Sequence, residues 1–208
     1  MKSRYRRTAV LAILALFLAA CIKSSRDGEA YIKPEASRKK APGFSLKDAN
    51  GDTVNLADYQ GKVVLVNFWA TWCGPCELEI PWFVEFEQKY KDRDFAVLGI
   101  SMDDDGWKSV KPFIASHKIN YRVMIGSELV SQQFGNIEAL PTSFILDRQG
   151  RIAVSHVGLV DKRDYLHEII KLMDSPTVDG PKPDIQKSAS VGGDAARQLA
   201  VLARPGAR

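Results

Sequence analysis

Two kinds of hydrophobic pattern alternate along the chain from residue 42 onward, and they predict different elements. Residues 62–70 (KVVLVNFWA) form a continuous apolar run rich in β-branched side chains, which predicts a strand buried on both faces. From residue 73 to residue 90 the apolar positions recur at helical spacing, so a helix follows that strand directly. Residues 42–56 alternate apolar and polar positions around the turn sequence DANG, which predicts a hairpin.

The same patterns continue to residue 173. The further strands they predict cover 95–102, 121–125, 143–147 and 151–157, and the further helices cover 107–118, 129–134 and 162–173. Because strands alternate with helices in this order, we expect an α/β fold with a mixed central sheet flanked by helices, over residues 41–174. The acidic run at 103–105 is expected to be a loop in which one Asp caps the next helix.

The two ends of the chain differ from this domain in composition. Residues 22–40 contain Ser, Gly, Pro and six Lys or Arg with few large apolar side chains, which is typical of a solvated tether. Residues 175–208 are rich in Pro and Gly, so we expect a disordered tail there.

Residues 1–20 have the pattern of an export signal. Basic side chains lead into an uncharged run over residues 8–20, which is shorter than the about 20 residues that a helix needs to cross a bilayer. The run ends in the sequence LAAC, which resembles the lipobox of bacterial lipoproteins. The resemblance implies a lipid on Cys21, removal of residues 1–20, and a membrane-anchored domain facing the periplasm or the cell exterior. An uncleaved anchor and a simple secretory signal are the alternatives.

The distribution of charge argues against nucleic acid as a partner. The formal net charge of the chain is +4, but residues 41–174 carry 14 Lys and Arg against 19 Asp and Glu. The positive charge therefore lies at the two ends, whereas a phosphate backbone is bound by basic residues clustered on the folded surface.

The strongest chemical signal is the sequence WCGPC at residues 72–76, at the change from a buried strand to a helix. Cys73 and Cys76, three residues apart on a first helical turn, lie on one face and are close enough for their sulfurs to join or part with little movement. Free backbone N–H groups and the helix dipole favour a thiolate at the first position. We therefore expect Cys73 to be the nucleophile and Cys76 to resolve the mixed disulfide.

This segment, with its neighbours in the run VNFWATWCGPC and the following EIP, resembles the active site of the thioredoxin superfamily, most closely its membrane-tethered TlpA/ResA-like branch. A second match is the sequence LPT at residues 140–142, which is similar to the cis-proline loop facing the CxxC in that fold. The resemblance implies a thioredoxin-like fold with an N-terminal hairpin and a helix-strand insertion near 107–125. We predict a cis bond between Leu140 and Pro141. The substrate-binding residues expected from the motif are Trp72, Gly74, Pro75, Leu140, Pro141, Val157 and Gly158.

The chain differs from thioredoxin in the group that could accept the proton of Cys76. Thioredoxin has a buried Asp at the position of Asn67, and an amide cannot accept a proton at working pH. Glu77 and Glu79 are the nearest carboxylates in sequence, and as first-turn acids both are expected to interact with the helix dipole. Of these two carboxylates, Glu79 is the better candidate for proton transfer with Cys76. Asn67 is retained as the second residue expected to take part in it.

Other uses of the cysteine pair are weaker. A zinc site needs four ligands, and His117, His156 and His167 follow no ligand spacing, so we expect no metal and no cofactor. An inert disulfide over so short a loop would gain little stability. A peroxiredoxin would have Thr where Ala70 stands, and a copper chaperone of the Sco kind would have a CxxxC.

The sequence thus predicts a monomeric, lipid-anchored thiol-disulfide oxidoreductase that reduces protein disulfides. Gly and Pro between the cysteines favour a reducing couple nearer to thioredoxin, at about −270 mV, than to strong oxidants near −120 mV. The resemblance implies a transmembrane electron donor of the DsbD/CcdA kind and clients that include apocytochrome c. The alternatives are a client-binding protein without catalysis, a disulfide oxidase and a peroxide-handling redoxin.

Overall fold

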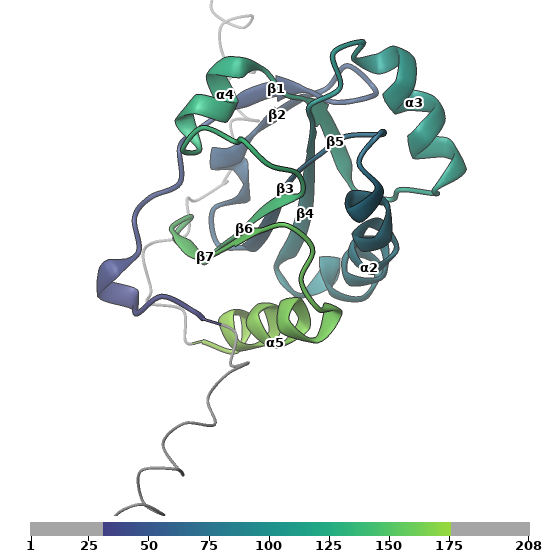
Figure 1. Cartoon of the computed structure of the whole chain (residues 1–208). Helices are drawn as coiled ribbons and strands as arrows, with labels where there is room; N and C mark the ends of the chain where they lie inside the picture. Colours follow the sequence, from purple (N-terminus) through teal and green to yellow (C-terminus); the bar gives the residue numbers. More distant parts are fainter. Residues whose placement is uncertain (1–30, 176–208) are drawn as a thin grey trace, which may run out of the picture. The chain divides into compact units, whose positions relative to one another are not determined.

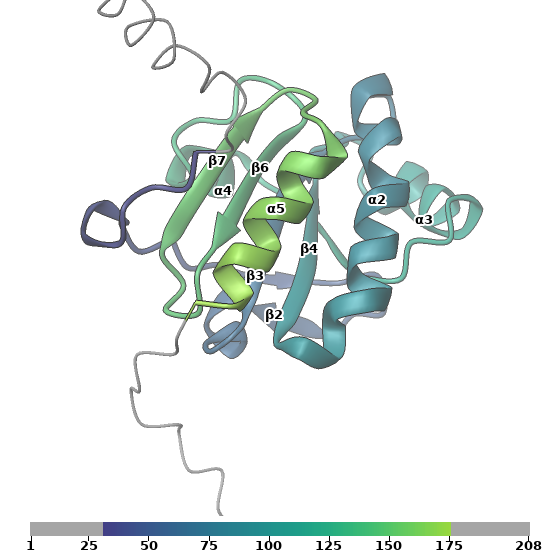
Figure 2. The same ribbon diagram turned by 90° about the horizontal axis from the view of Figure 1, so that it is seen from below.

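The computed structural model describes residues 31–175, in which a twisted sheet carries elements on both faces (Figures 1 and 2). The strands are β3 (Val63–Trp69), β4 (Phe95–Ser101), β5 (Arg122–Ile125), β6 (Thr142–Leu146) and β7 (Ile152–Val157). They lie in the order β5-β4-β3-β6-β7. β3, β4 and β5 are parallel, whereas β6 is antiparallel to β3 and β7 to β6. The mixed central sheet expected from the alternation of patterns is confirmed.

Helices and a hairpin cover this sheet. The helices are α2 (Gly74–Tyr90), α3 (Trp107–Ser116), α4 (Glu128–Gln133) and α5 (Lys162–Met173), with short 3-10 turns η1 (Glu35–Ser37), η2 (Leu56–Tyr59) and η3 (Lys91–Arg93). The hairpin joins β1 (Ser45–Lys47) to β2 (Thr53–Asn55), with Leu46 opposite Val54. Both the hairpin and the helix-strand insertion, α3 and β5, are where the sequence predicted them.

Strand β3 divides the interior into two cores because its side chains alternate between the faces of the sheet. Val63, Leu65 and Trp69 belong to the core beneath α2, α3 and α5, which also buries Ile80, Phe83, Val110, Tyr165 and Ile169. Val64, Val66 and Phe68 belong to the core beneath the hairpin and α4, with Val54, Val130, Phe134 and Phe144. Figure 2 shows α2 and α5 side by side over the first face.

Part of the segment assigned to a solvated tether is packed against the domain. The N–H of Lys33 donates to the carbonyl of Ala153 at 2.8 Å, and the N–H of Ile152 donates to the carbonyl of Lys39 at 2.8 Å. Arg38 also pairs with the buried carboxylate of Asp147 at 3.2 Å. Residues 33–40 therefore cover the free edge of β7, and the boundary expected at Ala41 falls too late in the chain.

Several sequence predictions concern residues outside 31–175. The export signal, the lipid on Cys21 and the disordered tail after residue 175 all lie there and stay predictions. Within residues 31–175, no helix is long and apolar enough to cross a membrane.

Candidate active site

Cys73 and Cys76 form a disulfide at the start of α2, directly after the loop that leaves β3. Cys73 is the N-cap of the helix, and its Sγ accepts the N–H of Cys76 at 3.3 Å. The exposed fraction is 5% for Cys73 and 1% for Cys76, so Cys73 is the more exposed of the two residues. A sulfur that receives a backbone N–H at a helix N-terminus is favoured as a thiolate. The pair itself is where the sequence predicted it, and the roles of nucleophile and resolving thiol stay a prediction.

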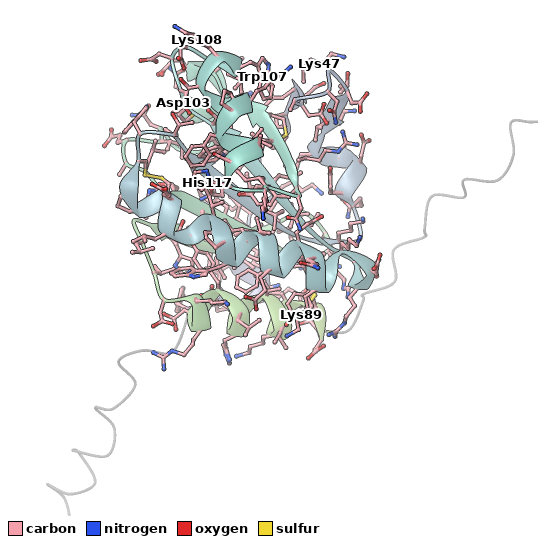
Figure 3. The ribbon with its side chains drawn as sticks, turned by 90° about the vertical axis from the view of Figure 1, so that its right-hand side faces the viewer. Lys47, Lys89, Asp103, Trp107, Lys108 and His117 are labelled. Carbon is pink, nitrogen blue, oxygen red and sulfur yellow. A yellow bond between two sulfur atoms is a disulfide. The ribbon has the colours of Figure 1, made fainter. Side chains whose placement is uncertain are left out.

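A buried carboxylate braces the loop between β3 and the disulfide. Asp103 accepts the N–H of Thr71 at 3.0 Å and the Thr71 hydroxyl at 2.5 Å, and the hydroxyl of Ser101 donates to it at 2.7 Å. In Figure 3, Asp103 lies toward the end of α2 that carries the yellow disulfide bond. The sequence assigned this residue to an acidic loop with one Asp as a helix cap. The loop is confirmed, but the expected Asp cap is wrong, because Gly106 is the N-cap of α3 and no side chain caps the helix; Asp103 holds the active-site loop instead.

The loop at Pro141 lies beside the same end of β3. The peptide bond between Leu140 and Pro141 is cis, which confirms the prediction. Thr142 at the start of β6 pairs with Phe68 near the end of β3 and with Val157 at the end of β7. The carbonyl of Pro141 also accepts the N–H of Gly158 at 2.7 Å. Antiparallel pairing thus brings these segments to the end of the sheet at which β3 finishes and α2 begins.

Exposed apolar side chains lie at this end of the sheet. Trp72 and Val157 are each 71% exposed, and Leu159 is 44% exposed. Large apolar groups left in water next to a reactive site are typical of surfaces that contact a partner. The structure therefore brings together the substrate-binding residues that the motif named, while their contact with a client stays a prediction.

Glu79 differs from the first-turn acid that the sequence favoured. Its side chain is fully buried, and Oε1 accepts the hydroxyl proton of Tyr165 at 3.0 Å. Burial raises the pKa of Glu79 from 4.5 to about 7, although the hydrogen bond from Tyr165 acts in the opposite direction. Glu77 does remain at the surface, where it pairs with His117 at 3.0 Å. The dipole interpretation therefore fits Glu77 and is wrong for Glu79, which is a buried acid one helical turn beyond Cys76.

Asn67 is connected to Glu79 through side chains from two other elements. Its Nδ2 donates to the hydroxyl of Ser143 on β6 at 3.0 Å. The Ser143 hydroxyl also acts on Tyr165 of α5, where it lowers the pKa of the Tyr165 hydroxyl, which burial raises. Ser143 and Tyr165 belong to no motif, so sequence reasoning missed both. Glu79 did carry a signal, because it lies three residues after Cys76 and four before Phe83, on the apolar face of the helix.

Two of the histidines pair with different carboxylates. His117, labelled in Figure 3, pairs from the end of α3 with Glu77, and His156 pairs with the buried Glu168 at 2.8 Å. In the part of the chain that the structure describes, no three His, Cys, Asp or Glu side chains are placed to hold a metal ion.

Comparison with known proteins gives consistent matches. The family model described as AhpC/TSA matches residues 38–155. The thiol-disulfide oxidoreductase ResA of Bacillus thuringiensis is 34% identical over 135 residues, covering 64% of this chain and 76% of that protein. The thioredoxin-like protein YneN of Bacillus subtilis is 34% identical over 128 residues, covering 61% of this chain and 74% of that protein.

Solved structures match over the same region. The crystal structure of a thiol:disulfide interchange protein described as DsbE from Chlorobium tepidum has a TM-score of 0.60 and 32% identity, and covers 65% of this chain and 96% of that one. The solution structure of a thioredoxin from Neisseria meningitidis has a TM-score of 0.62 and 34% identity, with coverage of 67% and 93%. The fold is therefore thioredoxin-like, as the resemblance implied.

Proposed function

We propose that this chain, which belongs to the AhpC/TSA family of thioredoxin-like proteins, reduces the disulfides of protein clients outside the cytoplasm. It is a thiol-disulfide oxidoreductase, since that is the activity of the relatives it matches and the chemistry of its paired cysteines. The single observation that carries the proposal is the cysteine pair at the N-terminus of α2 with a buried acid one turn beyond it.

The reaction that this geometry supports has two steps. The Cys73 thiolate attacks one sulfur of a client disulfide, so a disulfide between Cys73 and the client forms and the other client sulfur leaves as a thiolate. Cys76 then gives its proton to Glu79, and the Cys76 thiolate attacks Sγ of Cys73, which releases the second client thiolate. Two electrons pass from the enzyme to the client, and the enzyme is left with the Cys73–Cys76 disulfide.

Glu79 suits the second step for a physical reason. A proton acceptor works best when its pKa lies near the working pH, and burial has raised the pKa of Glu79 to about 7. Asn67 cannot accept the proton itself, and its contribution is to hold Ser143 in place.

The reducing direction, the clients and the location belong to the same proposal. Gly74 and Pro75 between the cysteines support a reducing couple, and apocytochrome c is a client class that the resemblance implies. A reductant outside the cytoplasm needs a supply of electrons, which we assign to a transmembrane dithiol protein of the DsbD/CcdA kind. Lipid on Cys21 would hold the domain at the membrane, with the support of the LAAC sequence.

Insulin reduction with dithiothreitol tests the proposal. We expect turnover by the wild type, none by Cys73→Ser, and a trapped mixed disulfide with Cys76→Ser. The reduction potential, measured against glutathione buffers, should lie nearer to −270 mV than to about −120 mV. A potential near the upper value would make the protein an oxidase, and wild-type protein that binds insulin without turnover would make it a binding protein. Consumption of hydrogen peroxide at a comparable rate would favour the peroxide-handling alternative.

A further inference from the structure

Tyr165 is a buried hydroxyl that the two thiol steps do not use. Its side chain is fully buried on α5. The ring of Phe83 meets the Tyr165 ring edge-on at 5.2 Å, and the ring of His156 meets it at 5.1 Å and 77°. A ring held from two sides keeps its hydroxyl in one position, so the contact with Glu79 is fixed by packing.

The hydrogen bonds that reach Glu79 run in one direction. The amide nitrogen of Asn67 can only donate, and it donates to Ser143. Tyr165 donates to Oε1 of Glu79, so its own oxygen is left to accept from the Ser143 hydroxyl, which lowers the pKa of Tyr165. Ser143 accepts from Asn67 and Tyr165 donates to Glu79, so both bonds point toward the carboxyl group, and polar groups aligned in this way strengthen one another.

This direction distinguishes the two oxygens of Glu79. Oε1 is occupied by the Tyr165 proton at 3.0 Å, whereas Oε2 is buried and accepts no side-chain hydrogen bond among residues 31–175. The backbone N–H of Val160 also acts on this carboxyl group and lowers its pKa. We propose that Tyr165, held by Ser143, is a positioning residue that keeps Oε1 as a permanent acceptor and leaves Oε2 as the atom that exchanges a proton with the active-site thiols. The inference rests on the proposed role of Glu79 in the second step.

Other titratable groups lie around Glu79 and Tyr165. Cys76 lies on the same helix, Tyr165 and Glu168 lie on α5, His156 lies on β7, and Tyr121 lies just before β5. His156 is engaged by Glu168 at 2.8 Å. Tyr121 is buried, and its hydroxyl has no partner in the described residues. It therefore offers a matched control, a buried tyrosine near Glu79 that donates no proton to it.

The experiment follows the carboxyl group directly. In the oxidised protein the two cysteines do not titrate, so the carboxyl carbon of Glu79, followed by carbon-13 NMR from pH 5 to pH 9, reports Glu79 itself. We expect a wild-type midpoint near 7 and a rise of about one pH unit in Tyr165→Phe, which loses a hydrogen bond to the charged form. Ser143→Ala should move the midpoint in the same direction by less, and Tyr121→Phe should leave it unchanged.

A second readout separates this inference from the proposed function. The pH of half-maximal insulin reduction by Tyr165→Phe should move by the same amount as its carboxyl midpoint. The inference is wrong if the carboxyl midpoint stays at the wild-type value in Tyr165→Phe, or if the midpoint moves and the activity profile does not. If Tyr165→Phe does not fold, an unchanged midpoint in Ser143→Ala overturns the inference and a raised one supports it. A wild-type protein that reduces no insulin would contradict the proposed function. The carboxyl titration would still test whether Tyr165 lowers the pKa of Glu79.

Discussion

Replacing Glu79 with Gln should make the protein more stable at alkaline pH while impairing its activity. The carboxyl is fully buried, and its pKa is raised from 4.5 to about 7. Between these two values the unfolded chain has lost the proton that the folded chain still holds. The free energy of unfolding of the wild type therefore falls as pH rises from about 4.5 to about 7, and above pH 7 the folded protein carries the full cost of a buried charge.

The size of this effect follows from the shift. A rise from 4.5 to about 7 corresponds to about 3 kcal/mol of lost stability above pH 7, at 1.36 kcal/mol for each unit. Gln keeps an oxygen for the Tyr165 hydroxyl but places an amide in the buried position of Oε2, at a cost of about 1–2 kcal/mol that does not depend on pH. Gln is thus expected to be slightly less stable than Glu at pH 5 and more stable at pH 8.

Urea unfolding of the oxidised wild type and Glu79→Gln at pH 5 and pH 8 measures this change. Comparing the two proteins at each pH removes the titration of all other groups. Glu85→Gln, on the same helix, is the control, because Glu85 is exposed and pairs with Lys162 at the surface. A stability difference between wild type and Glu79→Gln that is the same at both pH values would refute the reasoning. Turnover of insulin by Glu79→Gln should fall by about 100-fold or more if Glu79 accepts the proton of Cys76.

Three further predictions concern other parts of the chain. Asp103→Ala leaves the backbone N–H of the active-site loop and two hydroxyl groups without their acceptor, so urea unfolding should show a loss of about 2–4 kcal/mol, against little change for the exposed Asp104→Ala. A chain that starts at residue 41 should melt at a lower temperature than one that starts at residue 31, with a loss of about 1–3 kcal/mol, because it lacks the bonds of residues 33–40 to β7; equal melting temperatures would contradict the packing described above. Cys21→Ala should abolish incorporation of labelled fatty acid in cells, and unlabelled wild-type protein would rule out the lipid anchor.

Much of the fold follows from patterns that local sequence carries. The run VVLVNFW of β3 has no polar position that could face water except Asn67, so both its faces had to be covered. The two hairpins were marked by turn residues between short alternating segments. The active site was equally readable, because two cysteines at the start of a helix and a proline before a strand are local signals.

The parts that the sequence did not reveal depend on contacts between distant segments. Glu79 was expected to be a first-turn acid that interacts with the helix dipole, since a carboxylate is rarely buried. The Tyr165 hydroxyl from α5, 86 residues away, helps to make its burial tolerable, and no local pattern could predict that contact. Residues 33–40 have the composition of a tether, yet backbone bonds to the edge of β7 hold them without a large apolar side chain. Asp103 was hidden in a run of three acids, since its partners come from different segments: Ser101 ends β4, and Thr71 lies in the loop after β3.

The amide of Asn67 and the carboxyl group of Glu79 lie at two ends of the polar side chains that also include Ser143 and Tyr165. Thioredoxin, which the active-site sequence resembles, has a buried Asp at the position of Asn67. An ionised Asp has no proton to donate to Ser143, so the chain of donors that ends on Oε1 of Glu79 would lose its first member. Two carboxylates beneath the same cysteine pair would also raise each other's pKa, on top of the burial that already raises that of Glu79. A neutral donor at Asn67 on β3 therefore suits a buried acid on α2 one turn beyond Cys76, because it supplies a proton to Ser143 and adds no second negative charge.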